Sequence, residues 1–438
     1  MEPRPSATPD LMRQIEDLLI ELVQAVAPAR RPGPGRPVIL PAMLLWVGLT
    51  VCVLRGFTSQ LALWRLLTAK GLWQAGQVVI SDEAVYRRLG AADPGPLAEV
   101  FGQLTALLTE RVAPWQEQGI APFATEVVVL DETTLDPVAR TLPALRERAV
   151  GDHVLLPGTI AGLYDVRRQL WRAIQVRADP HQNEKVVARD LVADLPAGAL
   201  ILADLGYFGF AWFDDLTDAG QWWISRMRKN TTYTVEHTYY QNGATLDALV
   251  WLGSYRADRA KYLVRMVRFR HGEAIHSYIT NVTDPQVLSI REIAELYARR
   301  WDIEMAVKVV KRDLKLHLLW SAKPVVVLHQ VWAVLLIAQI VQALRLEIAG
   351  RAGVDTLEVS IPLLIQYLPQ YSAQGTDPIE AFVHDGRRLG FIRPVRRVPI
   401  TAPAVAHEQL SLPPPDLQRT RVPRYGTSRR HALMKAAN

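Results

Sequence analysis

The chain has 438 residues, of which 49% are apolar, so it is long enough for two or three domains and apolar enough to fill at least one large core. Lysine and arginine number 50 against 44 aspartates and glutamates, and this modest excess of +6 weakly favours an anionic partner such as nucleic acid. The single cysteine, Cys52, excludes an internal disulfide framework and a site built from several thiolates.

The first part of the chain has helical spacing. Thr8-Pro9-Asp10 is a good helix start, and apolar residues follow at helical spacing from Leu11 to Val26. The opening residues lack the basic-then-apolar order of a secretion signal, so we expect a cytoplasmic protein.

Three more helices are expected between Pro41 and about Ala113, one of them opened by Ser81. That helix carries Arg87 and Arg88 and follows another after a short connection, as the reading helix of a helix-turn-helix would. Basic residues near a helix C-terminus also suit the helix dipole, so both interpretations stay open. We predict a helical N-terminal DNA-binding domain over residues 1–115.

Strand patterns begin after Pro122. The expected order is three strands, a helix, a strand, a helix and a strand, which a ribonuclease H-like fold requires. The strands are expected at 126–130, 154–164, 169–176, 199–203 and 221–226, and the helices at 181–195 and 211–219. We therefore predict an α/β fold of mixed α+β type, with the catalytic core at 116–229 and 284–322.

Alternating Tyr- and Val-rich segments interrupt this core, and Asn-Gly and His-Gly turn signals separate them. We predict a β-rich insertion at 230–283, with strands at 231–240, 262–270 and 276–281. Helices are expected again at 290–318, 325–348 and 361–368, so we assign 323–386 to C-terminal helices.

The last segment, 387–438, is expected to be a basic tail without a core of its own. Proline and arginine dominate it, and its charge could contact phosphates without specificity. Its arginines are Arg393, Arg396, Arg397, Arg419, Arg421, Arg424, Arg429 and Arg430.

Two apolar stretches, Val38–Leu54 and Val325–Leu346, approach the length of a membrane span. The first contains Pro41 and Gly48, and polar side chains interrupt the second. A spanning helix needs about 20 nearly uninterrupted apolar residues, so we expect buried core helices and no membrane partner.

Two aspartates follow buried apolar runs. Asp131 comes directly after Val127–Leu130, and Asp204 follows Leu200–Ala203 and precedes a glycine. We expect both to lie at strand ends beside one cleft, although an aspartate there often only caps the next turn.

Five residues of mixed charge share one face of the next predicted helix. Tyr297, Arg300, Glu304, Lys308 and Lys311 are separated by three, four, four and three positions, which at about 100° per residue aligns them. A carboxylate among cations suits a surface that faces phosphates and a divalent metal, although a solvated amphipathic face looks similar.

The segment from Tyr297 through Arg300 and Glu304 to Lys311 resembles the Tyr-Arg-Glu-Lys signature of DDE transposases from bacterial insertion sequences, in the large fourth family. That signature has two, three and six residues between its members, and this sequence meets it at every position. The residues after Asp131 and Asp204 also resemble the segments around the family's two aspartates. Glu132 departs from the glycine or serine often found there, but neighbouring side chains on an extended chain point oppositely.

The resemblance implies that Asp131, Asp204 and Glu304 are the catalytic residues and hold two Mg²⁺ ions, with Mn²⁺ as the alternative, roughly 3.5 to 4 Å apart. It implies cleavage that frees a 3′-hydroxyl and transfer of that hydroxyl to target DNA. Arg300, Lys308 and Lys311 would then contact DNA phosphates, with Tyr297 alongside them.

The partners that the resemblance implies are double-stranded DNA, as terminal inverted repeats and as target, and a second copy of the chain in a synaptic homodimer. The place of action would be the bacterial nucleoid. Trp251 could stack an unpaired base, although packing in a core explains a tryptophan more simply. The alternative function is that of a domesticated or inactive homologue that binds DNA without cutting it. A third reading is a membrane-associated protein built around the two apolar helices.

Overall fold

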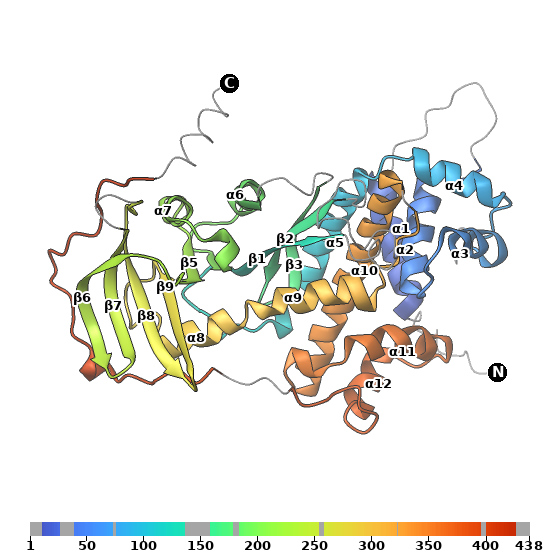
Figure 1. The fold of residues 1–438 in the computed structure, drawn as a ribbon. Coiled ribbons are helices and arrows are strands. Elements are labelled where there is room, and N and C mark those ends of the chain that lie inside the picture. Colours follow the sequence, from blue (N-terminus) through green and yellow to red (C-terminus); the bar gives the residue numbers. More distant parts are fainter. Residues whose placement is uncertain are drawn as a thin grey trace, which may run out of the picture.

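Five helices gather at one end of the molecule, coloured blue and cyan in Figure 1. The computed structural model describes residues 11–26, 39–72, 76–135, 158–177, 184–253, 258–321, 323–395 and 400–425. The helices are α1 Leu11–Val26, α2 Ala42–Leu54, α3 Gln60–Arg65, α4 Asp82–Ala91 and α5 Pro96–Val112. They agree with the helical pattern of the sequence, whereas the helix start predicted at 8–10 lies outside the described residues.

A nine-stranded sheet in the order β3-β2-β1-β4-β5-β9-β8-β7-β6 forms the rest of the frame. In its first half, β1 pairs antiparallel with β2 and parallel with β4, and β4 pairs parallel with β5. This arrangement is ribonuclease H-like and confirms the predicted fold class. The strands are β1 Val127–Thr134, β2 Thr159–Asp165, β3 Leu170–Arg177, β4 Leu200–Ala203 and β5 Trp222–Arg226.

The insertion is not a separate sheet. Its strand β9 pairs antiparallel with β5, so the four inserted strands continue the core sheet edge to edge. Strand β7 was not predicted, because its residues are buried almost throughout and lack the alternation of a half-exposed strand. The four strands are β6 Tyr233–Asn242, β7 Thr245–Leu252, β8 Leu263–His271 and β9 Ala274–Thr280.

Alternate residues of the central strands pack on opposite faces of the sheet. On one face, Val128 and Ile201 pack with α6 Glu184–Ala193 and α7 Phe210–Asp218. On the other face, the core is shared with the N-terminal helices and with the helices that follow the insertion. The strand residues on this second face include Val127, Val129, Leu200, Leu202 and Ile224.

Strand β1 is longer than predicted. Asp131 lies inside the strand and not after its end, because antiparallel pairing with β2 continues from Asp131 opposite Gly162 to Thr134 opposite Thr159. The sequence pattern ended the strand at Leu130 because the residues that follow are polar. Backbone pairing with β2 keeps them extended.

The single helix predicted at 290–318 is two helices in the structure. Helix α8 Ile290–Ala298 ends before α9 Trp301–Lys308 begins, and a π-helical turn, Val309–Asp313, follows α9. Tyr297 and Glu304 therefore belong to different helices, although they remain close to one another along the chain.

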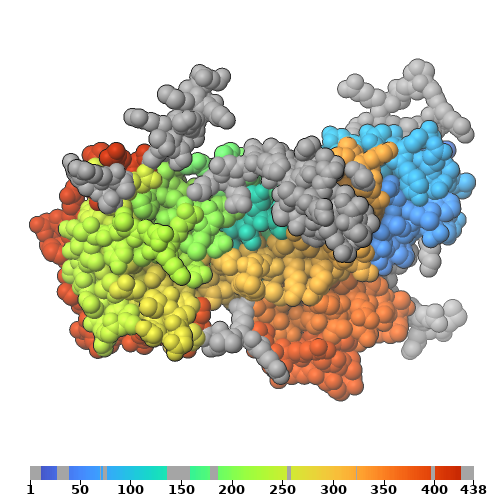
Figure 2. All heavy atoms as spheres, in the orientation of Figure 1, coloured from blue at the N-terminus to red at the C-terminus, as the bar shows by residue number. Residues whose placement is uncertain are grey.

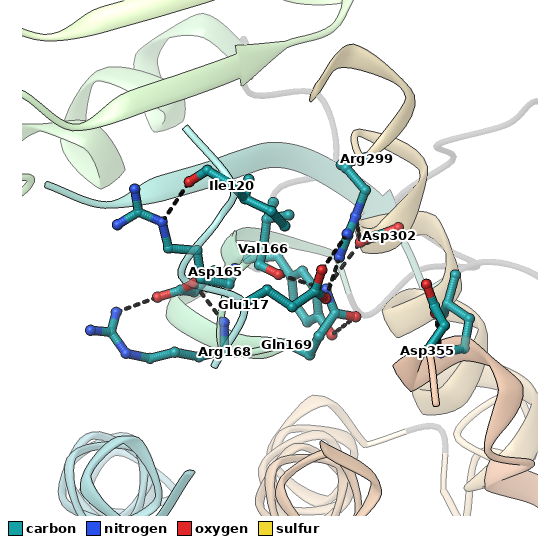
Figure 3. A network of polar contacts seen from close by, with 12 residues as sticks. Glu117, Ile120, Asp165, Val166, Arg168, Gln169, Arg299, Asp302 and Asp355 are labelled. Carbon is teal, nitrogen blue, oxygen red and sulfur yellow. Dashed lines mark hydrogen bonds and ion pairs between the residues drawn. The ribbon is translucent and has the colours of Figure 1, made fainter. Parts of the chain in front are cut away.

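Ion pairs hold the junction between α8 and α9 in place (Figure 3). Both terminal nitrogens of Arg299 donate to Glu117, at 2.8 and 2.9 Å, and its Nε donates to Asp302 at 2.7 Å. Gln169 Nε2 donates to the same Asp302 oxygen at 3.0 Å. Burial alone would lower the pKa of Arg299, but the hydrogen bonds and charges of the two carboxylates raise it. The junction is thus tied to the segment after α5 and to the turn between β2 and β3.

Helix α10 Pro324–Ala352 contains the apolar stretch Val325–Leu346, which approaches the length of a membrane span. By length and composition it could cross a membrane, but 83% of its most apolar window is buried inside the protein. Its polar residues bind neighbouring elements: Gln339 accepts from the Trp171 backbone amide at 2.9 Å and donates to Thr105 Oγ1 at 2.7 Å. Two helices, α11 Ile361–Ala373 and α12 Pro378–Asp385, follow it. The structure favours the interpretation of α10 as a core helix.

The basic segment near the C-terminus, which was expected to have no core of its own, packs against the insertion. Residues 400–425 run along the outer edge of β6–β9, in red in Figure 1 and Figure 2. Leu410 and Leu417 pack on a small cluster that contains Trp251, and Arg421 lies 4.7 Å from the centre of the Trp251 ring. We call residues 400–425 the C-terminal strap. Arg396, Arg397, Arg429 and Arg430 lie outside the described residues.

We expect Asp302→Asn to lower the free energy of unfolding by about 3 kcal/mol, because it leaves the largely buried Arg299 without its innermost carboxylate. Urea denaturation of the full chain measures this loss. Glu117→Gln is the matched control: Glu117 is 32% exposed, so we expect a loss of about 1 kcal/mol. Equal, small losses in both variants would mean that the Asp302 carboxylate does not stabilise the junction.

Candidate active site

Asp131 and Asp204 occupy equivalent positions on neighbouring parallel strands. The register pairs Val129 with Leu202, and continuing it by two residues brings Asp131 opposite Asp204. Both aspartates continue the alternation of Val129 and Leu202, so they belong to the face of the sheet that packs against α8 and α9. The sequence prediction that the two aspartates converge at one edge of the sheet agrees with this register.

Arg300 links Glu304, on α9, to Asp204. Arg300 Nη2 donates to Glu304 Oε1 at 2.7 Å, and Arg300 Nε lies 3.9 Å from Asp204 Oδ1. One guanidinium therefore faces two of the three predicted carboxylates. Their spacing along α9, four residues, places Arg300 and Glu304 on the same side of the helix.

Burial raises the pKa of Asp131 to about 6. The Glu132 backbone amide, which donates to Asp131 Oδ1 at 2.9 Å, and the charge of Arg300 oppose the increase, while the charges of Glu304 and Asp204 add to it. All three acids and Arg300 thus act on one another electrostatically. A raised carboxyl pKa produced by burial and like charges is typical of functional sites.

Three carboxylates have the donor chemistry that Mg²⁺ and Mn²⁺ prefer. As the side chains stand, however, no three His, Cys, Asp or Glu residues in the described part of the chain are placed to hold a metal ion together. Arg300 provides the positive charge between Asp204 and Glu304. The oxygen donors therefore have the chemistry that a hard divalent ion prefers, while Arg300 is the cation that they face in this structure.

Tyr297 and Lys311 are held against the strands that carry the aspartates. Tyr297 is 6% exposed, and its hydroxyl lies 3.5 Å from the carbonyl oxygen of Ala203, the last residue of β4. Burial raises the pKa of Tyr297. Lys311 Nζ donates to Thr133 Oγ1 at 2.7 Å and to the Thr134 carbonyl. Lys308 is exposed on α9.

Glu132 lies on the opposite face of β1 from Asp131. It continues the alternation of Val128 and Leu130, which pack toward α6 and α7. This placement agrees with the expectation that neighbouring side chains on the strand point oppositely, and it separates Glu132 from Asp204 and Glu304.

A cavity of about 370 Å³ adjoins Arg300, and the sequence alone did not indicate most of its lining. Arg226 at the end of β5 and the 54% exposed Trp301 border it, together with aromatic rings of β9. The sequence signal for this cavity was Trp301, directly after Arg300, and the structure shows that its side chain is exposed. The lining residues are Arg226, His276, Tyr278, Tyr297, Ala298, Arg300, Trp301 and Ile400.

Three other predicted residues lie elsewhere. Arg87 and Arg88 are exposed on α4, and Arg88 Nε donates to the Leu40 carbonyl at 3.2 Å. Trp251 is 8% exposed, and its Nε1 donates to Glu236 at 3.1 Å. The packing of Trp251 under the C-terminal strap agrees with a role in a small core.

Comparison with known proteins gives a family for this arrangement. Residues 159–340 match the family described as "Transposase DDE domain", a range that includes Asp204 and Glu304 and begins after Asp131. The chain is 25% identical over 178 residues to the transposase InsG for insertion sequence element IS4 of Escherichia coli (strain K12). That match covers 38% of this chain and 39% of the relative, so it spans well under half of either protein.

A solved structure, the cryo-EM structure of the piggyBac transposase synaptic complex with hairpin DNA, has 10% sequence identity and a TM-score of 0.39, over 90% of this chain and 85% of that one. The matched range 159–340 includes the whole segment from Tyr297 to Lys311 that carries the Tyr-Arg-Glu-Lys signature. In this chain, the sheet register aligns the two aspartates. Residues 159–340 therefore match a transposase DDE domain, and part of the chain is similar to the transposase of insertion sequence element IS4.

Proposed function

We propose that this chain is a transposase that cleaves and joins DNA at Asp131, Asp204 and Glu304. The observation that carries the proposal is the parallel register of β1 and β4, which aligns the two aspartates on the face where α9 presents Glu304 and Arg300. The substrates would be the terminal inverted repeats of an insertion sequence and its target DNA. Divalent metals serve DDE transposases generally, and the three carboxylates offer the oxygen donors for them.

In the proposed reaction, the three carboxylates would hold two Mg²⁺ or Mn²⁺ ions, which would activate the attacking oxygen and neutralise charge on the leaving oxygen. Arg300 releases Glu304 and turns toward the phosphate, where its fork of N–H donors suits two phosphate oxygens. Lys311 fixes the end of β1 beyond Asp131, and Tyr297 fixes α8 against β4. These two contacts keep the carboxylates aligned when DNA enters.

The rest of the chain would present the DNA to this site. We assign end recognition to the N-terminal helices, residues 1–115, with Arg87 and Arg88 as phosphate or base contacts. Lys308, exposed on α9, would contact the backbone beside the cleaved bond. Two copies would act together on two ends in the bacterial cytoplasm, as part of the nucleoid.

The first test is cleavage of a duplex that carries the DNA bordering this coding region, in Mg²⁺. We expect Asp131→Asn and Glu304→Gln each to lower the cleavage rate by at least about 100-fold, because each removes a charged oxygen donor. Glu132→Gln is the control, since Glu132 lies on the other face of β1, and it should retain cleavage. Cleavage by the first two variants at the original rate would exclude this site, and a chain that binds the duplex without cleaving it would be an inactive homologue.

The second test uses the metal-free protein. The folded chain holds the Asp131 proton up to about pH 6, whereas the unfolded chain releases it near pH 4, so this carboxyl destabilises the fold progressively as pH rises through that window. Asp131→Asn should therefore raise the free energy of unfolding by about 2 kcal/mol near pH 8 and by little near pH 4.

Chemical denaturation in EDTA at both pH values measures this gain. The control is Asp204→Asn, whose side chain is 43% exposed, so water already solvates its charge in the folded chain. A gain for Asp131→Asn that does not depend on pH would show that the raised carboxyl pKa is not its source.

The third test concerns competition between Arg300 and metal ions for the same carboxylates. We expect Arg300→Gln to bind Mn²⁺ roughly tenfold more tightly, because it removes the cation that faces Glu304 and Asp204, and yet to cleave DNA more slowly. Titration calorimetry measures the affinity for Mn²⁺. Lys308→Gln removes an exposed charge from the same helix and should change that affinity less. Unchanged Mn²⁺ affinity in Arg300→Gln would contradict the competition.

A further inference from the structure

A second cavity lies next to the segment that follows Asp204. It has a volume of about 740 Å³ and is open to solvent at the connection between β5 and β6. Its lining includes the loop from Arg228 to Thr232 and two phenylalanines that follow Asp204. The lining residues are Phe208, Phe210, Arg228, Lys229, Asn230, Thr231, Thr232 and Asp258.

The polar lining of this cavity suits an anion. Arg228 and Lys229 are both exposed, and neither forms an ion pair with another described residue. Asn230, Thr231 and Thr232 add an amide and two hydroxyls that can donate hydrogen bonds. Asp258 is the one acid among the lining residues that the structure describes. Two cations with neighbouring hydroxyl and amide donors form the kind of surface that contacts a phosphate backbone.

Two contacts hold Arg228 against the segment that follows Asp204. Its Nη2 donates to the Leu205 carbonyl oxygen at 2.9 Å, and its guanidinium carbon lies 5.1 Å from the centre of the Phe208 ring. Leu205 directly follows Asp204. A guanidinium fixed by a ring and one carbonyl loses little freedom when its other N–H groups bind a ligand.

The two cavities share one stretch of chain. Arg226, at the end of β5, lines the cavity beside Arg300, and Arg228 and Lys229, two and three residues further along the chain, line the second cavity. Three cations therefore lie on the short connection between the end of β5 and the start of β6.

We infer that the loop 228–232 binds the sugar-phosphate backbone of DNA flanking the reacting bond, with Arg228 and Lys229 each contacting a phosphate. The inference rests on the proposed function and adds a binding surface to it. Each phosphate contact by a cation steepens the dependence of DNA affinity on salt by about one unit of log affinity per log salt concentration.

The test measures binding of a fluorescein-labelled duplex that carries the DNA bordering this coding region, by anisotropy in EDTA over a range of NaCl concentrations. We expect Arg228→Ala with Lys229→Ala to reduce the salt slope by about two and to weaken binding at least about tenfold in moderate salt. The matched control is Arg387→Ala with Arg388→Ala, which removes the same charge from two exposed residues that follow α12.

The Arg228 substitution removes the hydrogen bond to Leu205 and could disturb the fold, so Lys229→Ala alone is measured as well. It should reduce the salt slope of DNA binding by about one without changing the melting temperature. Equal slopes for the two double variants, or no change in Lys229→Ala, would overturn the inference and leave the proposed function standing. Failure of the unmodified chain to bind the duplex would overturn both.

Discussion

The parallel pairing of β1 with β4 is the contact on which the site depends. Because Val129 lies opposite Leu202, two carboxylates two residues further on arrive at the same edge and on the same face of the sheet. Burial is the main cause of the raised pKa of Asp131, and the like charges of Glu304 and Asp204 add to it. Arg300 offsets part of this cost while it pairs with Glu304. Three carboxylates and one guanidinium thus meet at this edge of the sheet.

The α8–α9 junction extends this alignment to a third segment of the chain. Arg299 and Arg300 are adjacent but have different partners: Arg299 pairs with Glu117 and the buried Asp302, whereas Arg300 faces Glu304 and Asp204. The ion pairs of Arg299 hold the start of α9 in place, and the position of that start determines the direction of the Glu304 side chain. A network outside the site thus determines its geometry, as supporting residues commonly do around metal and catalytic sites.

The sequence predicted the charged residues of the site more reliably than the breaks and extensions of the backbone elements. The apolar runs before Asp131 and Asp204 predicted two neighbouring strands, because a buried strand leaves a clear signal in one segment. The break between α8 and α9 left none, since residues 290–308 suit a helix throughout and the ion pairs of Arg299 come from distant segments. The packing of the C-terminal strap could not be predicted either. A proline-rich composition indicates that a segment cannot form a core alone, but it does not indicate whether the segment packs on another domain.

The C-terminal strap also has a consequence for how the protein is made. Arg421 donates to the carbonyls of Leu252 and Ala260, and Tyr425 donates to Asp214 on α7, so the last described residues contact segments that are translated long before them. A ribosome must therefore release residue 425 before the insertion has all its neighbours. Nascent chains that end before the C-terminal strap contain Asp131, Asp204 and Glu304 but lack the segment that packs on the outer strands.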